Sequence, residues 1–280
     1  MQENKVIWIT GASSGIGKAL SIKFANEGWH VAASARRENL LKELNQQNKN
    51  IHPFPLDVTD IEQCKTVFKN IIEKFKDIEI CVFGTGIHDP QSEKEFNLEK
   101  IRKIMEVNYF GTMNSINSVY NYYKDKKSGQ ISIVSSVAGY RGLPAAGAYC
   151  ASKSALTSFA ESLHFEMKRK NVRISLISPG FIKTPMTDQN DFPMPMIKSP
   201  EFAAEQIYIG LTKKKTFEIH FPKVFTYFLK FLSILPSSIY FKIVEKGMKD
   251  LFFVKKLLIY PTKHTEEYLH ILKSRKDLES

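Results

Sequence analysis

The sequence predicts an α/β protein whose parallel sheet is doubly wound, with helices on both of its faces. Short β-branched runs alternate with longer helical stretches over the first two hundred residues, and a glycine-rich turn joins the first run to the first helix. The chain is 43% apolar and 25% charged, a composition that can form a core. Its 280 residues suit one sheet-based domain with a C-terminal helical extension.

The expected strands and helices follow one another along the chain. The predicted strands are Val6–Ile9, His30–Ser34, Ile51–Leu56, Ile78–Phe83, Gln130–Val134 and Arg173–Ile177. The predicted helices are Gly15–Glu27, Glu38–Asn45, Ile61–Phe75, Leu98–Tyr123 and Tyr149–Lys170. In such a fold, ligands bind at the carboxyl ends of the strands, so motifs at those ends are the candidate sites.

A glycine-rich turn follows the first strand and indicates dinucleotide binding. Glycine lets the backbone turn sharply and approach a pyrophosphate, while the N–H groups at the start of a helix can donate hydrogen bonds to it. The alternative, an ordinary tight turn, is less favoured because the motif lies between a strand and a helix. The residues assigned to this Rossmann-like phosphate site are Gly11, Ser13, Ser14, Gly15, Ile16 and Gly17.

The second strand ends in a pair of arginines, Arg36 and Arg37. An acidic residue at this point would bind the ribose 2′-hydroxyl of NAD, whereas a basic residue accommodates the 2′-phosphate of NADP. Guanidinium groups suit a phosphate because they can donate two parallel hydrogen bonds to it. We therefore expect NADP(H) as the cofactor. The alternative is that both arginines are solvated surface residues that contact no phosphate.

Tyr149 and Lys153 lie four residues apart, which places them on one face of a helix. A tyrosine whose pKa is about 10 shuttles protons poorly at neutral pH, and a neighbouring ammonium is expected to lower that pKa. Such a pair is common by chance. Here, however, a strand that ends in Ser135 and Ser136 precedes it.

The glycine turn, the strand-terminal serine and the Tyr-x-x-x-Lys pair together resemble the short-chain dehydrogenase/reductase family over roughly residues 5 to 200. The resemblance implies that Ser136, Tyr149, Lys153 and Asn108 are catalytic. It also assigns Asp57 and Val58 to the adenine ring. Further cofactor contacts are implied for Tyr149, Lys153, Gly84, Pro179, Gly180 and Thr184. One segment departs from the family pattern, because Phe83–Gly86 stands where the family has Asn-Asn-Ala-Gly.

The resemblance also implies a mechanism that needs no metal. The nicotinamide would deliver hydride to a carbonyl carbon while Tyr149 protonates the oxygen and Ser136 hydrogen-bonds it. Lys153 would hold the nicotinamide ribose and lower the pKa of Tyr149, and Asn108 would position a water that relays protons. The alternative class is a regulatory protein that senses the dinucleotide without catalysis, or a membrane-surface scaffold on the same fold. Intact Ser136, Tyr149 and Lys153 favour the enzyme.

A proline-rich segment, 181–200, predicts a long loop that could act as a lid and would end a dinucleotide-binding and catalytic domain, 1–200. Its apolar side chains favour an apolar or lipid-like carbonyl substrate; they are Met186, Phe192, Met194 and Met196. Residues 201–280 would form a basic, aromatic, helical extension.

Most of the net charge of +11 lies in one segment, 213–256, where ten lysines and three acidic residues sum to +7. Because aromatic residues are interleaved with these lysines, the segment favours a membrane surface over nucleic acid. Packing of its aromatic residues over the substrate pocket or in a dimer interface remains an equal alternative. Three scattered cysteines and the absence of a signal peptide predict a cytoplasmic protein, and we expect a homo-oligomer, a dimer or tetramer.

Overall fold

The computed structural model contains a seven-stranded parallel sheet in the order β3-β2-β1-β4-β5-β6-β7. The strands are β1 (Val6–Thr10), β2 (His30–Ser34), β3 (Ile51–Pro53), β4 (Ile80–Phe83), β5 (Gln130–Val134), β6 (Arg173–Pro179) and β7 (Glu218–Phe221). The α-helices are α1 (Gly15–Asn26), α2 (Glu38–Gln47), α3 (Ile61–Phe75), α5 (Leu98–Met105), α6 (Gly111–Lys126), α7 (Gly147–Lys168), α8 (Pro200–Tyr208) and α9 (Lys223–Ser233). The structure describes residues 5–90, 96–190 and 194–247. The predicted doubly wound α/β fold is confirmed.

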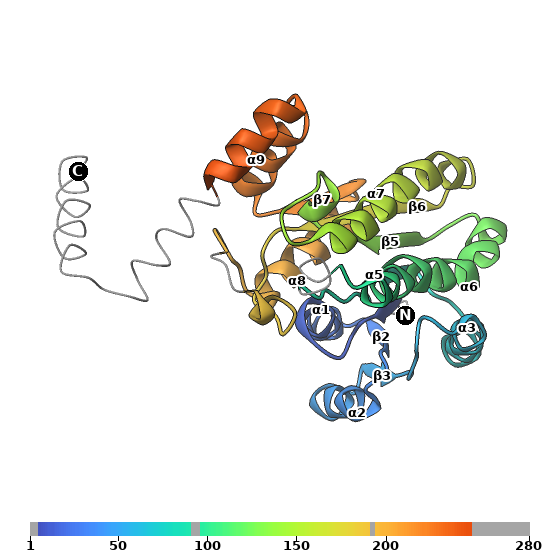
Figure 1. The fold of residues 1–280 in the computed structure, drawn as a ribbon. Helices are drawn as coiled ribbons and strands as arrows, with labels where there is room; N and C mark the ends of the chain where they lie inside the picture. Colours follow the sequence, from blue (N-terminus) through green and yellow to red (C-terminus); the bar gives the residue numbers. More distant parts are fainter. Residues whose placement is uncertain (1–4, 91–95, 191–193, 248–280) are drawn as a thin grey trace, which may run out of the picture. The chain divides into compact units, whose positions relative to one another are not determined.

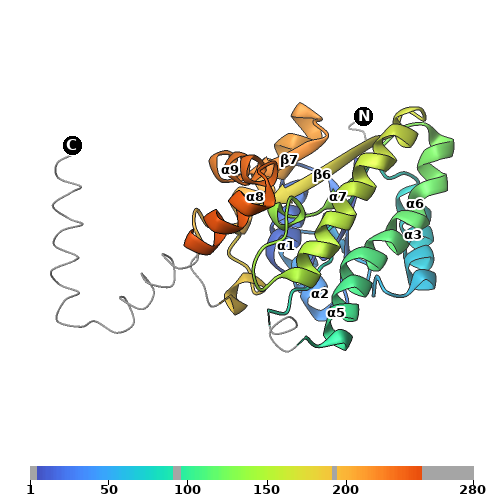
Figure 2. The ribbon, with the colours of Figure 1, turned by 45° about the horizontal axis from the view of Figure 1, so that its top comes forward.

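Helices cover both faces of the sheet (Figures 1 and 2). The packing of the β1 side chains divides these helices into two layers. Ile7 and Ile9 point to one face and pack with residues of α1, α2 and α8. Val6 and Trp8 point to the other face and pack with residues of α3, α6 and α7. Since side chains alternate along a strand, this short apolar run supplies both cores at once.

The sheet continues past residue 200, where the change in composition suggested that the catalytic domain ends. Strand β7 pairs with β6, and Ala203 and Ile207 of α8 join the core under α1. Residues 1–189 and 196–230 accordingly form one unit, whereas 190–195 and 231–280 form another. In the second unit, residues 237–247 are helical. The proline-rich segment 181–200 is thus divided: residues 181–189 and 196–200 belong to the sheet-bearing unit, and that unit continues beyond residue 200.

Two predicted elements differ in ways that bear on the site. Strand β3 ends at Pro53 instead of Leu56, although the N–H groups of Phe54 and Leu56 still donate to the carbonyl oxygens of Ala33 and Ala35. The long helix predicted over Leu98–Tyr123 contains a π-helical turn, η1 (Glu106–Phe110), between α5 and α6. π-Turns of this kind are frequent at functional sites, and this one carries Asn108.

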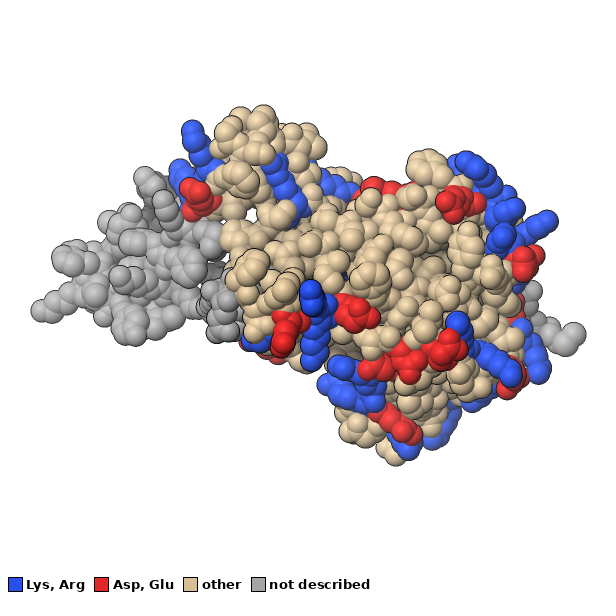
Figure 3. Space-filling model, turned by 45° about the vertical axis from the view of Figure 1, so that its right-hand side comes forward, with Lys and Arg blue, Asp and Glu red and all other residues tan. Residues whose placement is uncertain are grey.

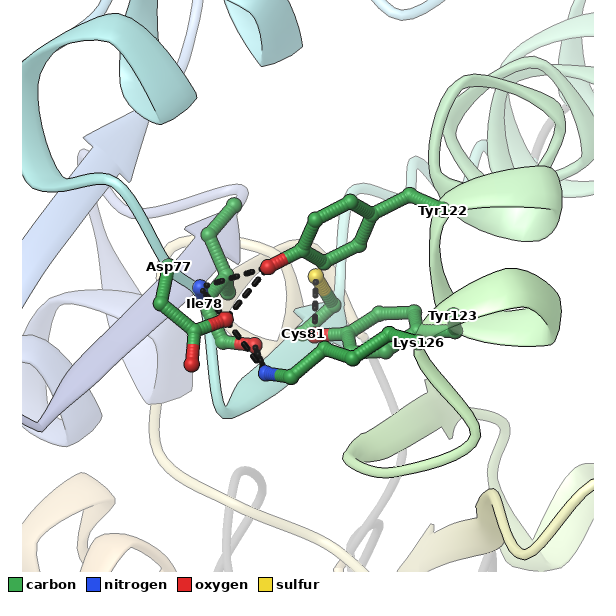
Figure 4. Close-up of polar contacts among 6 residues, drawn as sticks. All are labelled: Asp77, Ile78, Cys81, Tyr122, Tyr123 and Lys126. Carbon is green, nitrogen blue, oxygen red and sulfur yellow. Dashed lines mark hydrogen bonds and ion pairs between the residues drawn. The ribbon is translucent and has the colours of Figure 1, made fainter.

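Helix α6 is anchored to the loop before β4 by a small polar cluster (Figure 4). The Asp77 carboxylate accepts hydrogen bonds from the Tyr122 hydroxyl and from the Lys126 ammonium, both of α6, and from the N–H of Ile78. Partial burial raises the pKa of Asp77, but the hydrogen bonds from Lys126 and Tyr122 outweigh it and hold the pKa below its ordinary value. Beneath this cluster, the Cys81 thiol meets the Tyr123 hydroxyl at 3.3 Å.

Basic and acidic side chains are interspersed on the face of the molecule that Figure 3 shows, without a continuous basic expanse. This distribution agrees with a charge excess that is local in the sequence. Among the described helices, none is both long enough and apolar enough to cross a bilayer.

We expect Asp77→Asn to lower the free energy of unfolding by about 1 kcal/mol at pH 7, because the partly exposed carboxylate loses charge-assisted hydrogen bonds. The depressed pKa means that Asp77 contributes stability above its unfolded pKa of about 3.9 and loses it as the pH falls through its folded pKa. Urea unfolding at several pH values should therefore show the gap between wild type and variant closing in acid. Asp125→Asn, an exposed carboxylate on the same helix, is the matched control, and equal losses in both variants would contradict the anchoring role.

Candidate active site

The sheet order reverses between β1 and β4, and a cavity of about 410 Å³ opens at the carboxyl ends of the strands around this point. All the predicted site residues except Asn108 line this cavity. They are Gly11, Ser13, Ser14, Gly15, Ile16, Gly17, Arg36, Arg37, Asp57, Val58, Gly84, Ser136, Tyr149, Lys153, Pro179, Gly180 and Thr184. Residues spread over the first two thirds of the chain therefore meet at one place.

The glycine turn is packed too closely for other residue types. Gly11 has a φ of +75°, in the left-handed region, and a Cβ atom there would lie 2.9 Å from the carbonyl oxygen of Gly84. A Cβ atom at Gly17 would lie 2.3 Å from the carbonyl oxygen of Gly11. Ser14 precedes α1 without a side-chain hydrogen bond to the helix, and Gly15, Ile16 and Gly17 of its first turn line the cavity. This arrangement fits a pyrophosphate.

The two arginines take different positions at the edge of the cavity. Arg37 reaches back to the turn, where its guanidinium donates to the hydroxyls of Ser13 at 2.9 Å and Ser14 at 2.8 Å. Arg36 instead faces Asp57, with 4.0 Å between its Nη1 and a carboxylate oxygen. Arg37 is therefore the cation beside the glycine turn, whereas Arg36 lies next to Asp57 on another side of the cavity.

Ser136, Tyr149 and Lys153 meet where β5 ends and α7 begins. Lys153 is only 3% exposed, and its ammonium donates to the carbonyl oxygen of Val134 at 2.9 Å. The ammonium lies 5.6 Å from the centre of the Tyr149 ring. Ser135 binds α7 to β5 from the other side, because its hydroxyl donates to the carbonyl oxygen of Lys153 at 2.9 Å.

The pKa of Tyr149 is raised to about 12, whereas the sequence predicted a lowered value. Burial is the main cause, since it disfavours the phenolate, and a hydrogen bond with Ser136 opposes it only in part. Burial also lowers the pKa of Lys153 to about 8. Desolvation thus favours the neutral form of both groups, and at pH 7 Tyr149 carries a proton that it can donate.

The opposite wall of the cavity comes from the segment after β6. A Cβ atom at Gly15 would lie 3.0 Å from the Thr184 methyl group, so this segment reaches the glycine turn. Thr187 holds it in place, because its hydroxyl accepts from the Thr184 N–H at 2.9 Å and donates to the Ile182 carbonyl at 2.7 Å. The segment from Pro179 to Thr187 therefore lines the same cavity as Ser136, Tyr149 and Lys153.

Comparison with known proteins decides the family. The family model described as short chain dehydrogenase matches residues 5–193, which is more than half of the chain. The chain belongs to the short-chain dehydrogenase family. It is therefore an oxidoreductase of a family that uses NAD or NADP.

Relatives and solved structures of this family cover most of the chain. An uncharacterized oxidoreductase of Myxococcus xanthus is 30% identical over 83% of this chain and 93% of its own length. The 3-oxoacyl-(acyl-carrier-protein) reductase FabG of Thermotoga maritima is 36% identical over 67% of this chain and 78% of its own length. A short-chain dehydrogenase from Burkholderia cenocepacia, solved in complex with NADP, has a TM-score of 0.75 and 26% identity, and covers 87% of this chain and 99% of that one.

Asn108 occupies a place in this short-chain dehydrogenase that the sequence did not reveal. Its amide oxygen accepts from the Ile87 N–H at 2.7 Å, and its amide nitrogen donates to the Ile87 carbonyl at 2.9 Å and to the Ser152 hydroxyl at 3.0 Å. The side chain is completely buried. Both donor hydrogens are occupied by the protein, so the amide acts as a clamp between the loop after β4 and helix α7. Its predicted role in a proton relay stays a prediction.

The clamp holds the loop after β4, in which Thr85 and Gly86 were expected to permit close approach to the cofactor, whereas Ile87 and His88 were missed by the sequence reasoning. Thr85, Gly86 and Ile87 line the cavity, and the His88 ring lies 4.9 Å from the ring of Tyr149. The sequence could have indicated Ile87 and His88 as well, because they come soon after Gly84, which was already assigned to the cofactor site at the carboxyl end of β4. Phe192, one of the predicted lid residues, lies outside the described residues. Met186 lines the cavity, whereas Met196 is exposed.

We expect Asn108→Ala to lower the free energy of unfolding by about 2–3 kcal/mol, because it leaves buried backbone groups of Ile87 without a partner. Turnover per folded molecule should also fall, since the loop at His88 loses its anchor beside Tyr149. Asn114→Ala is the matched control: Asn114 also donates to backbone carbonyls, those of Val58 and Thr59, but does not contact Ile87. Urea unfolding with a steady-state assay measures both effects. Unchanged stability of Asn108→Ala would rule out the clamp.

Proposed function

We propose that the protein is an NADP(H)-dependent oxidoreductase that interconverts a carbonyl and a secondary alcohol on an apolar, lipid-like substrate. The observation that carries the proposal is that Ser136, Tyr149 and Lys153 line the same cavity as the glycine turn and Arg37. The dinucleotide supplies or accepts the hydride when it is bound. A proton donor, a hydroxyl and an ammonium in one cavity are what the other half of that reaction requires.

Each of the three side chains takes a distinct part. Tyr149, protonated at pH 7 because burial raises its pKa to about 12, donates a proton to the carbonyl oxygen as negative charge develops there. The Ser136 hydroxyl donates a hydrogen bond to the same oxygen. The Lys153 ammonium, at the base of the cavity, holds a ribose hydroxyl and places positive charge near the reacting oxygen.

The preference for NADP(H) rests on the cation at the phosphate turn. The Arg37 guanidinium already lies against the hydroxyls of Ser13 and Ser14, where it can reach a phosphate on the adenosine ribose. The solved relative from Burkholderia cenocepacia holds NADP, which supports the same choice here. FabG, whose name describes a reductase of acyl carrier protein-linked ketones, supports a lipid-like substrate class.

The apolar character of the substrate is supported by four apolar residues in the lining of the cavity. They are Ile87, Ile182, Pro185 and Met186. Such side chains favour a substrate that buries carbon rather than charge around its carbonyl.

Tyr149→Phe tests the chemistry. The variant keeps the ring but lacks the proton to donate, so we expect NADPH-dependent turnover to fall by about two orders of magnitude or more while NADPH still binds with near wild-type affinity. Turnover against a panel of aliphatic, steroid and 3-keto lipid carbonyls, with NADPH fluorescence titration, measures both. Turnover within a few-fold of wild type would overturn the catalytic assignment and favour a protein that only senses the dinucleotide.

Arg37→Ala tests the choice of cofactor. Loss of a charge-assisted hydrogen bond to the 2′-phosphate should weaken NADPH by about 10–100-fold and leave NADH within a few-fold. Arg36→Ala should have the smaller effect, because Arg36 faces Asp57. Arg169→Ala, an exposed arginine at the end of α7, is the neutral control. Equal losses of affinity for NADPH and NADH in Arg37→Ala would show that this arginine supports the glycine turn and does not bind the 2′-phosphate.

A further inference from the structure

Helix α9 carries an apolar face that is open to solvent. Val224, Tyr227, Phe228 and Phe231 have exposed fractions of 73%, 59%, 52% and 56%. Their spacing places them along one side of the helix, at 3.6 residues per turn. Single exposed apolar side chains are ordinary on a protein surface, whereas a contiguous row with three aromatic rings marks a contact site.

This exposure is imposed by how the other side of α9 is held. The Thr226 hydroxyl is fully buried and lies 2.6 Å from Nδ1 of His220 in β7. The Lys230 ammonium pairs with the Glu218 carboxylate, also in β7, and the same carboxylate accepts from the Tyr140 hydroxyl at 2.7 Å. These contacts hold one side of α9 against β7, and the Tyr227 ring at the edge of the row also packs there, with 5.0 Å between its centre and that of the His220 ring.

The sequence left two roles open for the aromatic residues of this segment: packing over the substrate pocket and contact with a membrane surface. In α9 one side of the helix packs over the pocket, and the other side is exposed. The Phe225 ring packs on Phe181, with 5.6 Å between ring centres, and it lies against Gly180, where a Cβ atom would be 3.0 Å away. This aromatic residue therefore covers the loop that forms the cavity wall. The aromatic residues on the other side do not take part in that packing.

Positive charge gathers at the start of the same helix. Lys223 is exposed, and its pKa is lowered by partial burial and then by the charges of Lys230 and Lys214. Lys213 and Lys215 flank Lys214 and are exposed as well. Like charges held this close repel one another, and an anionic surface would relieve that repulsion.

We propose that α9 seats the protein peripherally on an anionic lipid bilayer, with the aromatic row at the interface and the lysines at the lipid phosphates. Aromatic rings beside lysines are the combination that binds such interfaces. A second copy of the chain is the competing occupant of this face, and light scattering separates it from lipid. The proposal does not depend on the reaction, since binding to lipid requires no turnover.

A seat of this kind would lie close to the cavity wall. Phe225 connects α9 directly to Gly180 and Phe181, and the segment after them contributes Ile182 and Met186 to the cavity. Docking through α9 would thus bring the apolar end of the cavity near the lipid phase, where an apolar carbonyl compound dissolves.

Cosedimentation of the full-length protein with phosphatidylcholine vesicles, with and without phosphatidylserine, tests the proposal. We expect binding to the anionic vesicles at low salt that weakens as salt rises. Phe228→Ser combined with Phe231→Ser should reduce it about tenfold or more. Lys214→Glu combined with Lys223→Glu should reduce it about 25-fold or more. The matched controls are Phe165→Ser, a 66% exposed phenylalanine on α7, and Lys49→Glu, an exposed lysine after α2.

Three results would overturn the proposal. The first is no binding to anionic vesicles at low salt, and the second is binding that the controls reduce as much as the α9 variants do. The third is a change of molecular mass in light scattering for Phe228→Ser with Phe231→Ser without a change in vesicle binding, which would make the face an interface between copies. Melting temperatures and NADPH titration of each variant separate these results from misfolding and from failure of the proposed reaction.

Discussion

A buried ammonium group is the constraint on which the site depends. Lys153 belongs to α7, and its ammonium lies against the end of β5 with almost no solvent exposure. Transferring a charged amine into the protein costs several kcal/mol unless acceptors surround it. The Val134 carbonyl supplies one acceptor. A lysine ammonium has three donors, and Lys153 presents this group to the cavity that it lines. A polar ligand that accepts a hydrogen bond from this ammonium would therefore stabilise the buried charge, and the same bond would stabilise the bound ligand.

The surrounding structure keeps this ammonium in place. Ser135 holds the backbone of Lys153, and Asn108 bridges the neighbouring turn of α7 to the loop after β4. Because parallel strands all end at the same edge, the loops that follow β1 and β4 reach the cavity together with Val134 of β5 and Pro179 of β6. The π-turn η1 matters here, because it brings the Asn108 side chain into the interior between two regular helices.

Local features of the structure were accessible from the sequence. The glycine turn, the arginines after β2 and the Tyr149–Lys153 pair are short patterns whose geometry follows from neighbouring residues, and all of them line the cavity. Features that depend on packing were not accessible. The sequence predicted that Lys153 would lower the pKa of Tyr149, but burial of both groups reverses the direction. It also did not include β7, whose four residues become a strand because β6 offers them a free edge. Nor did it separate Phe225 from its exposed neighbours, because that division depends on which side of α9 meets β7.

We propose that one continuous cavity holds the dinucleotide from the arginines to Tyr149. The most direct test is a crystal structure of the full-length protein with NADPH. We expect the 2′-phosphate to contact Arg37, the pyrophosphate to lie on the first turn of α1, and a nicotinamide ribose hydroxyl to lie within hydrogen-bonding distance of the Lys153 ammonium. A dinucleotide bound outside this cavity, or bound with its adenine end at Lys153, would contradict it.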